Sequence, residues 1–280
     1  MVPVSYGSRA LFFYGDYKVD KVIAFVDGFN LYHSIKALNQ NQLKWLDLRS
    51  LCVNFAPSPQ FLINKIFYFS AYATWLPDAY QRHKEYIKAL ESRGVIPIMG
   101  KFKEKDRSCN ICSSMWKAHE EKETDVNIAL YILDEAYQNS FDRALIISAD
   151  SDLSPAVRLV KERFPSKTVR VLTPVNRKHS WDLVNAAGGL NFVKQIKKIH
   201  IERSLLPENL TDSLGNVIAT RPKKYLISKI LQLTLFCAVN QAQTGASFTL
   251  ESGHADESDS ISSGVIVARV SSAVRYRDPV

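Results

Sequence analysis

The sequence has few cysteines and no long apolar segment. Its four cysteines are too few for a disulfide scaffold in a chain of 280 residues, so we expect a protein of a reducing compartment, the cytoplasm. Residues 1–20 lack the uninterrupted apolar core of a signal peptide. The most apolar later stretch, Tyr225–Val239, is interrupted by polar residues and is shorter than the roughly 20 residues that a membrane span requires. We therefore expect a soluble protein that does not enter a membrane.

The bulk composition is that of an ordinary globular protein, with 46% hydrophobic and 23% charged residues. The net charge is +8, which favours a polyanionic partner such as nucleic acid. The chain has no internal repeats, and its composition shifts near Leu205 toward turn-forming and basic residues. We predict an N-terminal extension at residues 1–20, one domain at residues 21–200, and a partly flexible C-terminal extension at residues 201–280.

Short apolar runs alternate with segments of helical periodicity through the first two thirds of the chain. Because buried strands of a parallel sheet read as continuous apolar runs, this alternation predicts an α/β fold with a mainly parallel central sheet. Strands are predicted at residues 21–27, 65–74, 95–103, 143–148, 168–172 and 191–196, with a separate one at 265–276. Helices are predicted at residues 29–38, 46–55, 77–92, 124–138, 153–163 and 179–187, and residues 104–119 are predicted to be irregular.

Acidic residues stand at the ends of two predicted strands and at the start of one helix. Asp27 ends the first apolar run, and Asp125 begins a helix. Asp150 and Asp152 follow the apolar run at residues 144–148. Ligands of open α/β sheets gather at the carboxyl ends of strands, so these carboxylates are expected to meet in one pocket. Close carboxylates raise one another's pKa, and a hard divalent cation such as Mg²⁺ relieves that repulsion, so the pattern predicts a metal site.

The same aspartates have a second interpretation as helix caps. Asp27, Asp125 and Asp150 each precede or begin a helix, where aspartate is preferred and favours the helix dipole. Capping would explain each aspartate singly. Their joint occurrence in three ordered segments favours the metal site.

Three sequence strings contain these acids and occur in order. They are Val26–Tyr32 (VDGFNLY), Glu121–Ala129 (EKETDVNIA) and Ser148–Leu153 (SADSDL). Together they resemble the NYN domain, a PIN-like ribonuclease family that includes the LabA-like bacterial proteins. The resemblance covers roughly residues 20–200 and depends on all three strings, because a single Asp-x-Asp is common by chance.

The resemblance implies a PIN-like three-layer sandwich and metal-dependent hydrolysis of RNA phosphodiester bonds. The carboxylates that would hold Mg²⁺ or Mn²⁺ are Asp27, Asp125, Asp150 and Asp152, and the supporting polar residues are Asn30, Thr124 and Ser148. In this family the cleavage leaves a 5′-phosphate and a 3′-hydroxyl. Asn30 also has a local alternative, because Asn in a first helical turn often bonds the backbone alone.

Three function classes remain open on the sequence. The first is an endoribonuclease in which the metal lowers the pKa of an attacking water and offsets charge on the phosphate. The second is an RNA-binding or protein-interaction module with a weak or inactive PIN-like pocket. The third is a phosphatase, although an aspartyl-phosphate enzyme would need a second acid after Asp27, where the sequence has Gly28-Phe29. We expect RNA as the partner, with self-association or a protein partner through the C-terminal extension as a further option.

Basic and aromatic residues suggest where RNA would bind. Lys101, Lys103 and Lys105 would lie on one face of a strand, either as a phosphate-binding rim or as a solvated edge protected from aggregation. Arg177 and Lys178 follow the strand at 168–172 on the carboxyl side of the sheet and are candidates for touching RNA. The aromatic candidates for base stacking, with burial in the core as the alternative, are Tyr72, Trp75 and Trp116.

A cysteine pair suggests a second, structural metal. Cys109 and Cys112 have the spacing of half a tetrahedral zinc site, and His119 is a candidate third ligand for Zn²⁺. No second pair supplies the fourth ligand, which leaves Cys52, Cys237 or a partner chain. Free thiols in a turn are the alternative.

Overall fold

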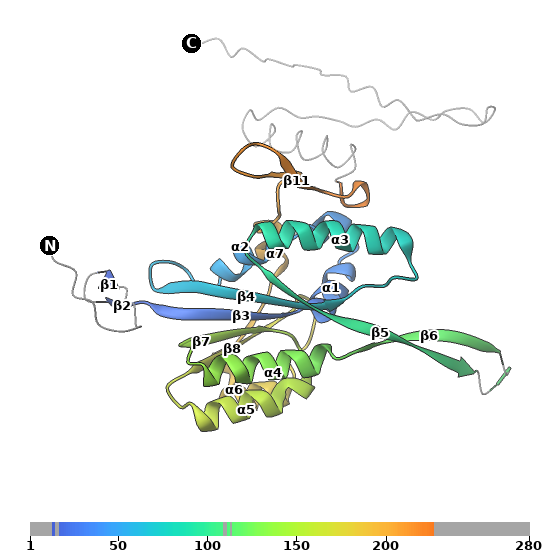
Figure 1. The fold of residues 1–280 in the computed structure, drawn as a ribbon. Coiled ribbons are helices and arrows are strands. Elements are labelled where there is room, and N and C mark those ends of the chain that lie inside the picture. The colour runs from blue at the N-terminus through green and yellow to red at the C-terminus, as the bar shows by residue number, and fades with distance from the viewer. Residues whose placement is uncertain (1–12, 15–16, 109–110, 113, 227–280) are drawn as a thin grey trace, which may run out of the picture. The chain divides into compact units, whose positions relative to one another are not determined.

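A seven-stranded sheet forms the centre of the computed structural model, which describes residues 13–14, 17–108, 111–112 and 114–226 (Figure 1). The strand order is β6-β5-β4-β3-β7-β8-β9, and all neighbours are parallel except β5 and β6. The strands are β3 (Asp20–Asp27), β4 (Phe61–Ala71), β5 (Ile96–Ser108), β6 (Met115–Lys122), β7 (Arg143–Ile147), β8 (Thr168–Thr173) and β9 (Val193–Gln195). A two-stranded element, β1 (Phe13–Tyr14) with β2 (Tyr17–Lys18), precedes the sheet.

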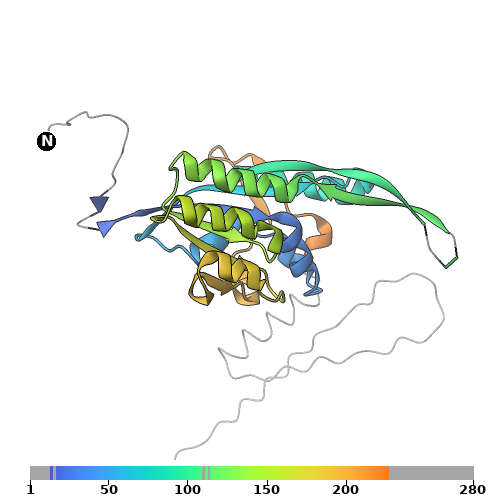
Figure 2. The ribbon, with the colours of Figure 1, turned by 90° about the horizontal axis from the view of Figure 1, so that it is seen from below.

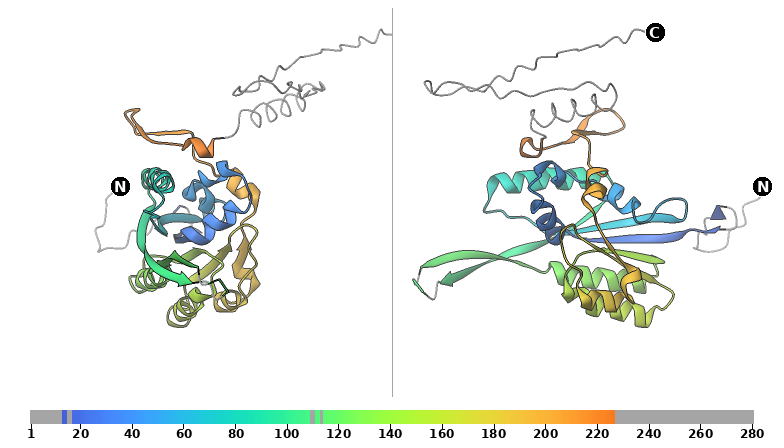
Figure 3. Two further views of the ribbon diagram at one scale, coloured as in Figure 1. Left: turned by 90° about the vertical axis from the view of Figure 1, so that its right-hand side faces the viewer. Right: turned by 180° about the vertical axis from the view of Figure 1, so that it is seen from behind.

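Helices cover both faces of the sheet, as the end-on view of Figure 3 shows. One layer contains α1 (Gly28–Lys36), α2 (Leu48–Val53), α3 (Pro77–Ser92) and the short α7 (Lys198–Glu202). The other layer contains α4 (Thr124–Tyr137), α5 (Ser154–Arg163) and α6 (Trp181–Ala187), which lie side by side in Figure 2. The 3-10 turns are η1 (Asn41–Lys44), η2 (Ser151–Leu153), η3 (Leu190–Phe192) and η4 (Lys223–Tyr225). The predicted α/β fold class, a three-layer sandwich, is confirmed.

The alternation of side chains along the central strand builds two cores. Successive residues of a strand point to opposite faces, so β3 sends Val22, Ala24 and Val26 into the core beneath α1, α2 and α3. Ile23 and Phe25 point into the other core, against α4, α5 and α6. All five side chains are fully buried, which explains why the strand reads as an uninterrupted apolar run.

The order of connections creates a switch point at the middle of the sheet. After β3 the chain passes through the α1–α2 layer to β4 on one side, and after β6 it passes through α4 to β7 on the other side of β3. At such a reversal the loops leaving the two strands diverge and open a crevice at their carboxyl ends. Asp27 ends β3 at this position, and Ser148–Asp150 follow β7 beside it.

Residues 104–108 and 115–119 differ from the sequence-based prediction, because they lie in two paired strands and not in an irregular segment. β5 and β6 pair in antiparallel register from Lys101↔Lys122 to Ser108↔Met115, and the hairpin extends beyond the helix layers (Figure 1). Its outer half carries charged residues on both strands and no apolar periodicity. Ion pairs across the strands, such as Lys117 with Glu104, stabilise a strand pair that a hydrophobic pattern cannot reveal.

The part of the predicted C-terminal extension that the structure describes packs onto the domain. β10 (Asn209–Thr211) and β11 (Val217–Thr220) form a hairpin against α3. A small core holds it there, made of Trp45, Ala89, Leu206, Leu210 and Ala219. Residues 1–12 and 227–280, including the strand predicted at 265–276, lie outside the described residues. None of the described helices is both long and apolar enough to cross a membrane.

Candidate functional site

Asp27 is the buried centre of the acidic residues, with only 4% of its surface exposed. Its carboxylate caps α1, because Oδ1 accepts a hydrogen bond from the backbone N–H of Asn30 at 2.9 Å. Oδ2 accepts a second one from the hydroxyl of Ser148 at 2.8 Å. The residue after it has to be glycine, since a Cβ on Gly28 would lie 2.5 Å from the carbonyl oxygen of Phe69. These contacts fix the Asp27 carboxylate at the carboxyl edge of the sheet.

The loop after β7 joins this carboxylate through Ser148. The same Ser148 hydroxyl accepts a hydrogen bond from the backbone N–H of Asp150 at 3.0 Å. Asp150 in turn caps η2, with Oδ1 accepting from the backbone N–H of Asp152 at 3.0 Å. The side chain of Asp152 is exposed at the rim. Two strand ends separated by more than a hundred residues in sequence are therefore connected by one hydroxyl group.

Asp125 comes from a third segment, the first turn of α4. The chain enters this helix through Glu123, whose φ of 78° is unusual for a residue with a side chain. Glu121 then accepts a hydrogen bond from the backbone N–H of Thr124 at 3.1 Å. Asp125 itself makes no capping hydrogen bond, so capping does not account for its carboxylate.

The electrostatics show that the three carboxylates influence one another. Burial raises the pKa of Asp27 from 3.8 to about 6, and the negative charges of Asp125 and Asp150 add to the rise against the two hydrogen bonds that oppose it. Burial also raises the pKa of Asp125 to about 6, with further contributions from Asp150, Glu121 and Asp152. Buried carboxylates with raised pKa values are concentrated at functional sites.

Glu121 was not among the site residues predicted from sequence. It lies at the end of β6, three residues before Thr124, and its negative charge acts on Asp125. The available signal was its place in the string EKETDVNIA, beside the predicted metal ligand Asp125.

Two buried oxygens of the predicted site also lack hydrogen-bond partners. Among the described residues, Asn30 Oδ1 and Thr124 Oγ1 are both buried and unpaired. A buried polar group without a partner costs about 1–3 kcal/mol, so native sites usually supply one. Both residues flank the acidic group in sequence, and both were predicted as its supporting polar residues.

These features fit a hydrated divalent cation better than a bare one. In the described part of the chain, no three or more His, Cys, Asp and Glu side chains are arranged to hold a metal ion. Mg²⁺ commonly keeps several waters and contacts protein through only one or two carboxylates. A water of such an ion that reached Asn30 Oδ1 or Thr124 Oγ1 would supply the donor that the oxygen lacks. The residues present therefore fit such an ion.

The helix-cap interpretation is correct for two of the three aspartates. Asp27 and Asp150 each cap a helix or turn, but each uses a single carboxylate oxygen to do so. Capping therefore leaves lone pairs for other ligands. It explains neither the position of Asp125 nor the raised pKa of Asp27 and Asp125.

The three hairpin lysines are all exposed, but they differ in their partners. Lys101 pairs with Glu123 at 3.0 Å, and Lys105 pairs with Glu120 at 3.7 Å. Lys103 forms no ion pair with any residue that the structure describes. Of the three, Lys103 is therefore the one whose charge is available to a phosphate.

Arg177 and Lys178 are exposed after β8, on the carboxyl side of the sheet as predicted. The charge of Arg177 contributes, after burial and Lys36, to lowering the pKa of His33 on α1. Positive charge therefore lies close to the helix that Asp27 caps.

The predicted zinc ligands are not seen together. Cys109 and Cys237 lie outside the described residues, so the zinc site stays a prediction. Cys112 contacts Ser114 near the hairpin tip. His119 pairs with Glu104 across the strands, well back from the tip, and its ring stacks on Trp75 with centroids 3.6 Å apart. Cys52 is fully buried in the core, and burial raises the pKa of its thiol to about 12.

The aromatic candidates for base stacking have different surroundings. One face of the Trp75 ring is stacked against His119, and the ring packs edge-on against Phe102. Tyr72 packs against Tyr80 and His83. Trp116 is 51% exposed on the outer part of β6 and remains a candidate.

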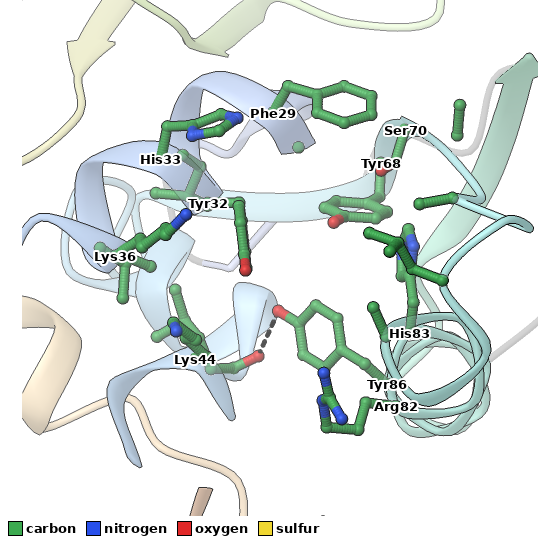
Figure 4. A pocket seen from close by; sticks show the side chains of 18 of the residues that line it. Phe29, Tyr32, His33, Lys36, Lys44, Tyr68, Ser70, Arg82, His83 and Tyr86 are labelled. Carbon is green, nitrogen blue, oxygen red and sulfur yellow. Dashed lines mark hydrogen bonds between the residues drawn. The ribbon is translucent and has the colours of Figure 1, made fainter. Parts of the chain in front are cut away.

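A cavity of about 330 Å³ adjoins the acidic group, and no motif in the sequence predicted it. It lies between α1, η1, the end of β4 and α3, as Figure 4 shows. Gly28 and Phe29, the two residues after Asp27, are part of its wall. Because its lining comes from segments far apart in the chain, only the folded arrangement reveals it.

Comparison with known proteins identifies the class and the family. The fold and the acidic switch point define a PIN-like α/β sandwich. The NYN domain matches residues 21–194, and the chain belongs to this family, which is generally a family of nucleases.

Individual relatives are distant. The chain is 25% identical over 201 residues to 6-hydroxy-3-succinoylpyridine 3-monooxygenase HspA of Pseudomonas putida (strain DSM 28022 / S16), covering 58% of this chain. It spans 63% of the length of that relative. A solved structure of a protein of unknown function from Vibrio parahaemolyticus RIMD 2210633 is 22% identical, with a TM-score of 0.46, covering 69% of this chain and 100% of that one.

Proposed function

We propose that this protein is a metal-dependent endoribonuclease that uses Asp27, Asp125 and Asp150 to hold Mg²⁺ or Mn²⁺. The observation that carries this proposal is electrostatic: the charges of Asp125 and Asp150, from two other segments, act on Asp27, and the pKa values of Asp27 and Asp125 are both raised to about 6. Membership of a nuclease family supports the same chemistry. Asp152, exposed at the rim, completes the acidic group.

The chain's own residues have defined tasks in this proposal. Ser148 orients the Asp27 carboxylate, and Asn30 and Thr124 offer oxygens to the water shell. A bound divalent cation supplies positive charge to the phosphate oxygens and lowers the pKa of a water molecule. No side chain becomes covalently attached to the substrate.

RNA is the proposed substrate because the chain combines an acidic centre with exposed basic residues and a net charge of +8. Lys103 on the hairpin and Arg177 with Lys178 after β8 are exposed cations that can contact the phosphates of a strand. A small phosphoester would need fewer such contacts.

A second candidate is an RNA-binding module that does not cleave. It is favoured by one observation, that no three carboxylates among the described residues are arranged to hold a metal ion. The basic surface serves both candidates equally, so only turnover separates them.

The monooxygenase relative suggests a third class, chemistry on a small heteroaromatic acid. That name describes a protein of which this chain spans 63%, at 25% identity. It provides a useful competing ligand in the experiments below.

The deciding experiment is cleavage of labelled RNA with Mg²⁺, Mn²⁺ or EDTA, with wild type and Asp150→Asn in parallel. We expect cleavage that needs metal and is lost in the variant. Binding without cleavage in either metal would favour the RNA-binding module. Cleavage that persists in Asp150→Asn would contradict the proposed site.

A further inference from the structure

The cavity beside the acidic group has the lining of a site for a planar ring. Aromatic side chains surround it from three elements, with Phe29 and Tyr32 on α1, Tyr68 on β4 and Tyr86 on α3. Its volume of about 330 Å³ falls within the range of small-molecule sites. Aromatic walls of this kind bind flat rings by stacking and edge contacts.

The cavity also contains polar atoms that can recognise a heteroatom. His83 lines the wall, and its buried Nε2 has no hydrogen-bond partner among the described residues. Burial lowers the pKa of His83 to about 4, so the ring is neutral near pH 7 and one of its two nitrogens is an acceptor. A purely hydrocarbon ligand would leave this nitrogen unpaired.

Four cations gather at the mouth of the cavity. Lys36, Lys44 and Arg82 line both the cavity and a second hollow that continues from it, where Lys224 joins them. Figure 4 shows Lys36 and Lys44 on one side of the opening and Arg82, on α3, across from them. None of the described residues lining either hollow is Asp or Glu.

The charges at this mouth are close enough to affect one another. Burial lowers the pKa of Lys44, and the positive charges of Lys224, Lys36 and Arg82 lower it further. A cluster of cations that no described carboxylate neutralises is a site for an anion. The group therefore differs from the hairpin lysines, two of which are neutralised by glutamates.

The cavity and the acidic group share a wall. Gly28 and Phe29 follow Asp27 directly, and the ring of Tyr68 lies under Gly28, where a Cβ would be 2.7 Å from it. A ligand in the cavity would therefore lie against Gly28, the residue that follows the proposed metal ligand Asp27.

We propose that this paired hollow binds one nucleotide unit, with its base in the aromatic cavity and its phosphate between Lys36, Lys44, Arg82 and Lys224. A bare phosphate would not need the aromatic cavity, and a neutral apolar ligand would not need four cations. The inference rests on the proposed function, since it describes how a strand to be cleaved is positioned beside Asp27. The source of the nucleotide is either an RNA strand or a free nucleotide.

The test measures binding in EDTA with full-length Asp150→Asn protein, so that cleavage does not interfere. The probes are adenosine monophosphate, adenosine, inorganic phosphate, a fluorescent oligoribonucleotide and a hydroxypyridine carboxylate. Arg82→Ala and Lys44→Ala remove charge at the mouth, and Ala79→Phe fills the cavity from α3. Lys84→Ala is the matched control, because it removes one positive charge from the same helix without lining either hollow.

We expect Arg82→Ala and Lys44→Ala each to weaken binding of the nucleotide about tenfold, as loss of one charged hydrogen bond predicts. Lys84→Ala should leave it unchanged, and adenosine and phosphate should each bind more weakly than the nucleotide. Thermal unfolding of each variant shows whether it is folded. Competition between oligoribonucleotide and mononucleotide would identify RNA as the source, and its absence would identify a free nucleotide.

Equal nucleotide binding in Arg82→Ala, Ala79→Phe and Lys84→Ala would overturn the inference. Binding of a hydroxypyridine carboxylate where nucleotides do not bind would also overturn it. The outcome is separable from that of the proposed function. If Ala79→Phe cleaves RNA at the wild-type rate, the nucleotide site is rejected and the ribonuclease proposal stands. If wild type binds the nucleotide but never cleaves RNA, the nucleotide site stands and the ribonuclease proposal is rejected.

Discussion

The hydroxyl of Ser148 donates a hydrogen bond to Oδ2 of Asp27 at 2.8 Å. It also accepts one from the backbone N–H of Asp150 at 3.0 Å. One buried side chain thus ties the end of β3 to the loop after β7 and orients the carboxylate that the proposed metal site needs.

Ser148→Ala should therefore lower cleavage without abolishing it. Loss of a hydrogen bond to a carboxylate costs about 1.5–3 kcal/mol, which corresponds to at least about a tenfold fall in rate. The pKa of Asp27 should rise further, because this bond is one of the influences that lower it. The loss should be largest near pH 6 and smaller at pH 8, which a pH–rate profile measures.

Ser154→Ala is the matched control for this change. The Ser154 hydroxyl is buried at the start of α5 and has no hydrogen-bond partner among the described residues. Removal of this hydroxyl should leave both the cleavage rate and its dependence on pH unchanged. A uniform loss at every pH in Ser148→Ala would mean that the hydroxyl acts only on the fold.

Asp125→Asn should lower the cleavage rate by at least about a hundredfold, which is the usual effect of losing one preorganised electrostatic group. Asn is nearly isosteric and leaves the helix start intact, and Asp125 makes no cap that could be lost. The comparison is Asp182→Asn, an exposed acid in the first turn of α6. Equal activity of the two variants would show that Asp125 serves only the helix dipole.

Relative to wild type, Asp27→Asn should become more stable as pH rises toward neutrality in the metal-free protein. The rise in the pKa of Asp27 from 3.8 to about 6 corresponds to about 3 kcal/mol that the charged carboxylate costs the fold. The folded protein holds this proton more tightly than the unfolded chain, so the contribution is fully favourable below pH 3.8 and is lost as pH rises through about 6. Asn keeps the cap on α1 and removes the charge, but its NH2 group cannot accept the hydrogen bond from Ser148, a loss that is the same at every pH.

Chemical unfolding in EDTA at pH 5 and pH 7.5 checks this prediction, with the difference between variant and wild type as the readout. That difference should grow toward neutral pH. Adding Mg²⁺ at a hundredfold excess over its dissociation constant should stabilise wild type by about 2.7 kcal/mol and Asp27→Asn much less. Equal stabilisation of both proteins would place the ion elsewhere.

The sequence predicted the fold and the acidic group because both depend on local signals. Val22–Val26 is apolar throughout because both faces of β3 are buried, and Asp27 ends it because the strand ends at the edge of the sheet. The hairpin was not predicted, since its strands are held by pairs such as Lys105 with Glu120 instead of an apolar face.

The cavity could not be predicted for a different reason. Tyr68, Arg82 and Lys44 are unremarkable in their own segments, and Lys224 comes from a part that was assigned to the extension. Their meeting depends on how α3 and η1 pack over the end of β4, which no local pattern encodes.

Lys103→Ala should weaken RNA binding more than Lys101→Ala. Lys101 is paired with Glu123, so its charge is already offset, whereas Lys103 has no such partner among the described residues. Loss of one phosphate contact to a single strand should reduce the slope of log affinity against log salt by about 0.7. Fluorescence anisotropy of a labelled oligoribonucleotide over a series of salt concentrations measures both quantities. Identical slopes for the two variants and wild type would mean that the hairpin lysines only keep the strand edge soluble and that RNA passes elsewhere, along Arg177 and Lys178.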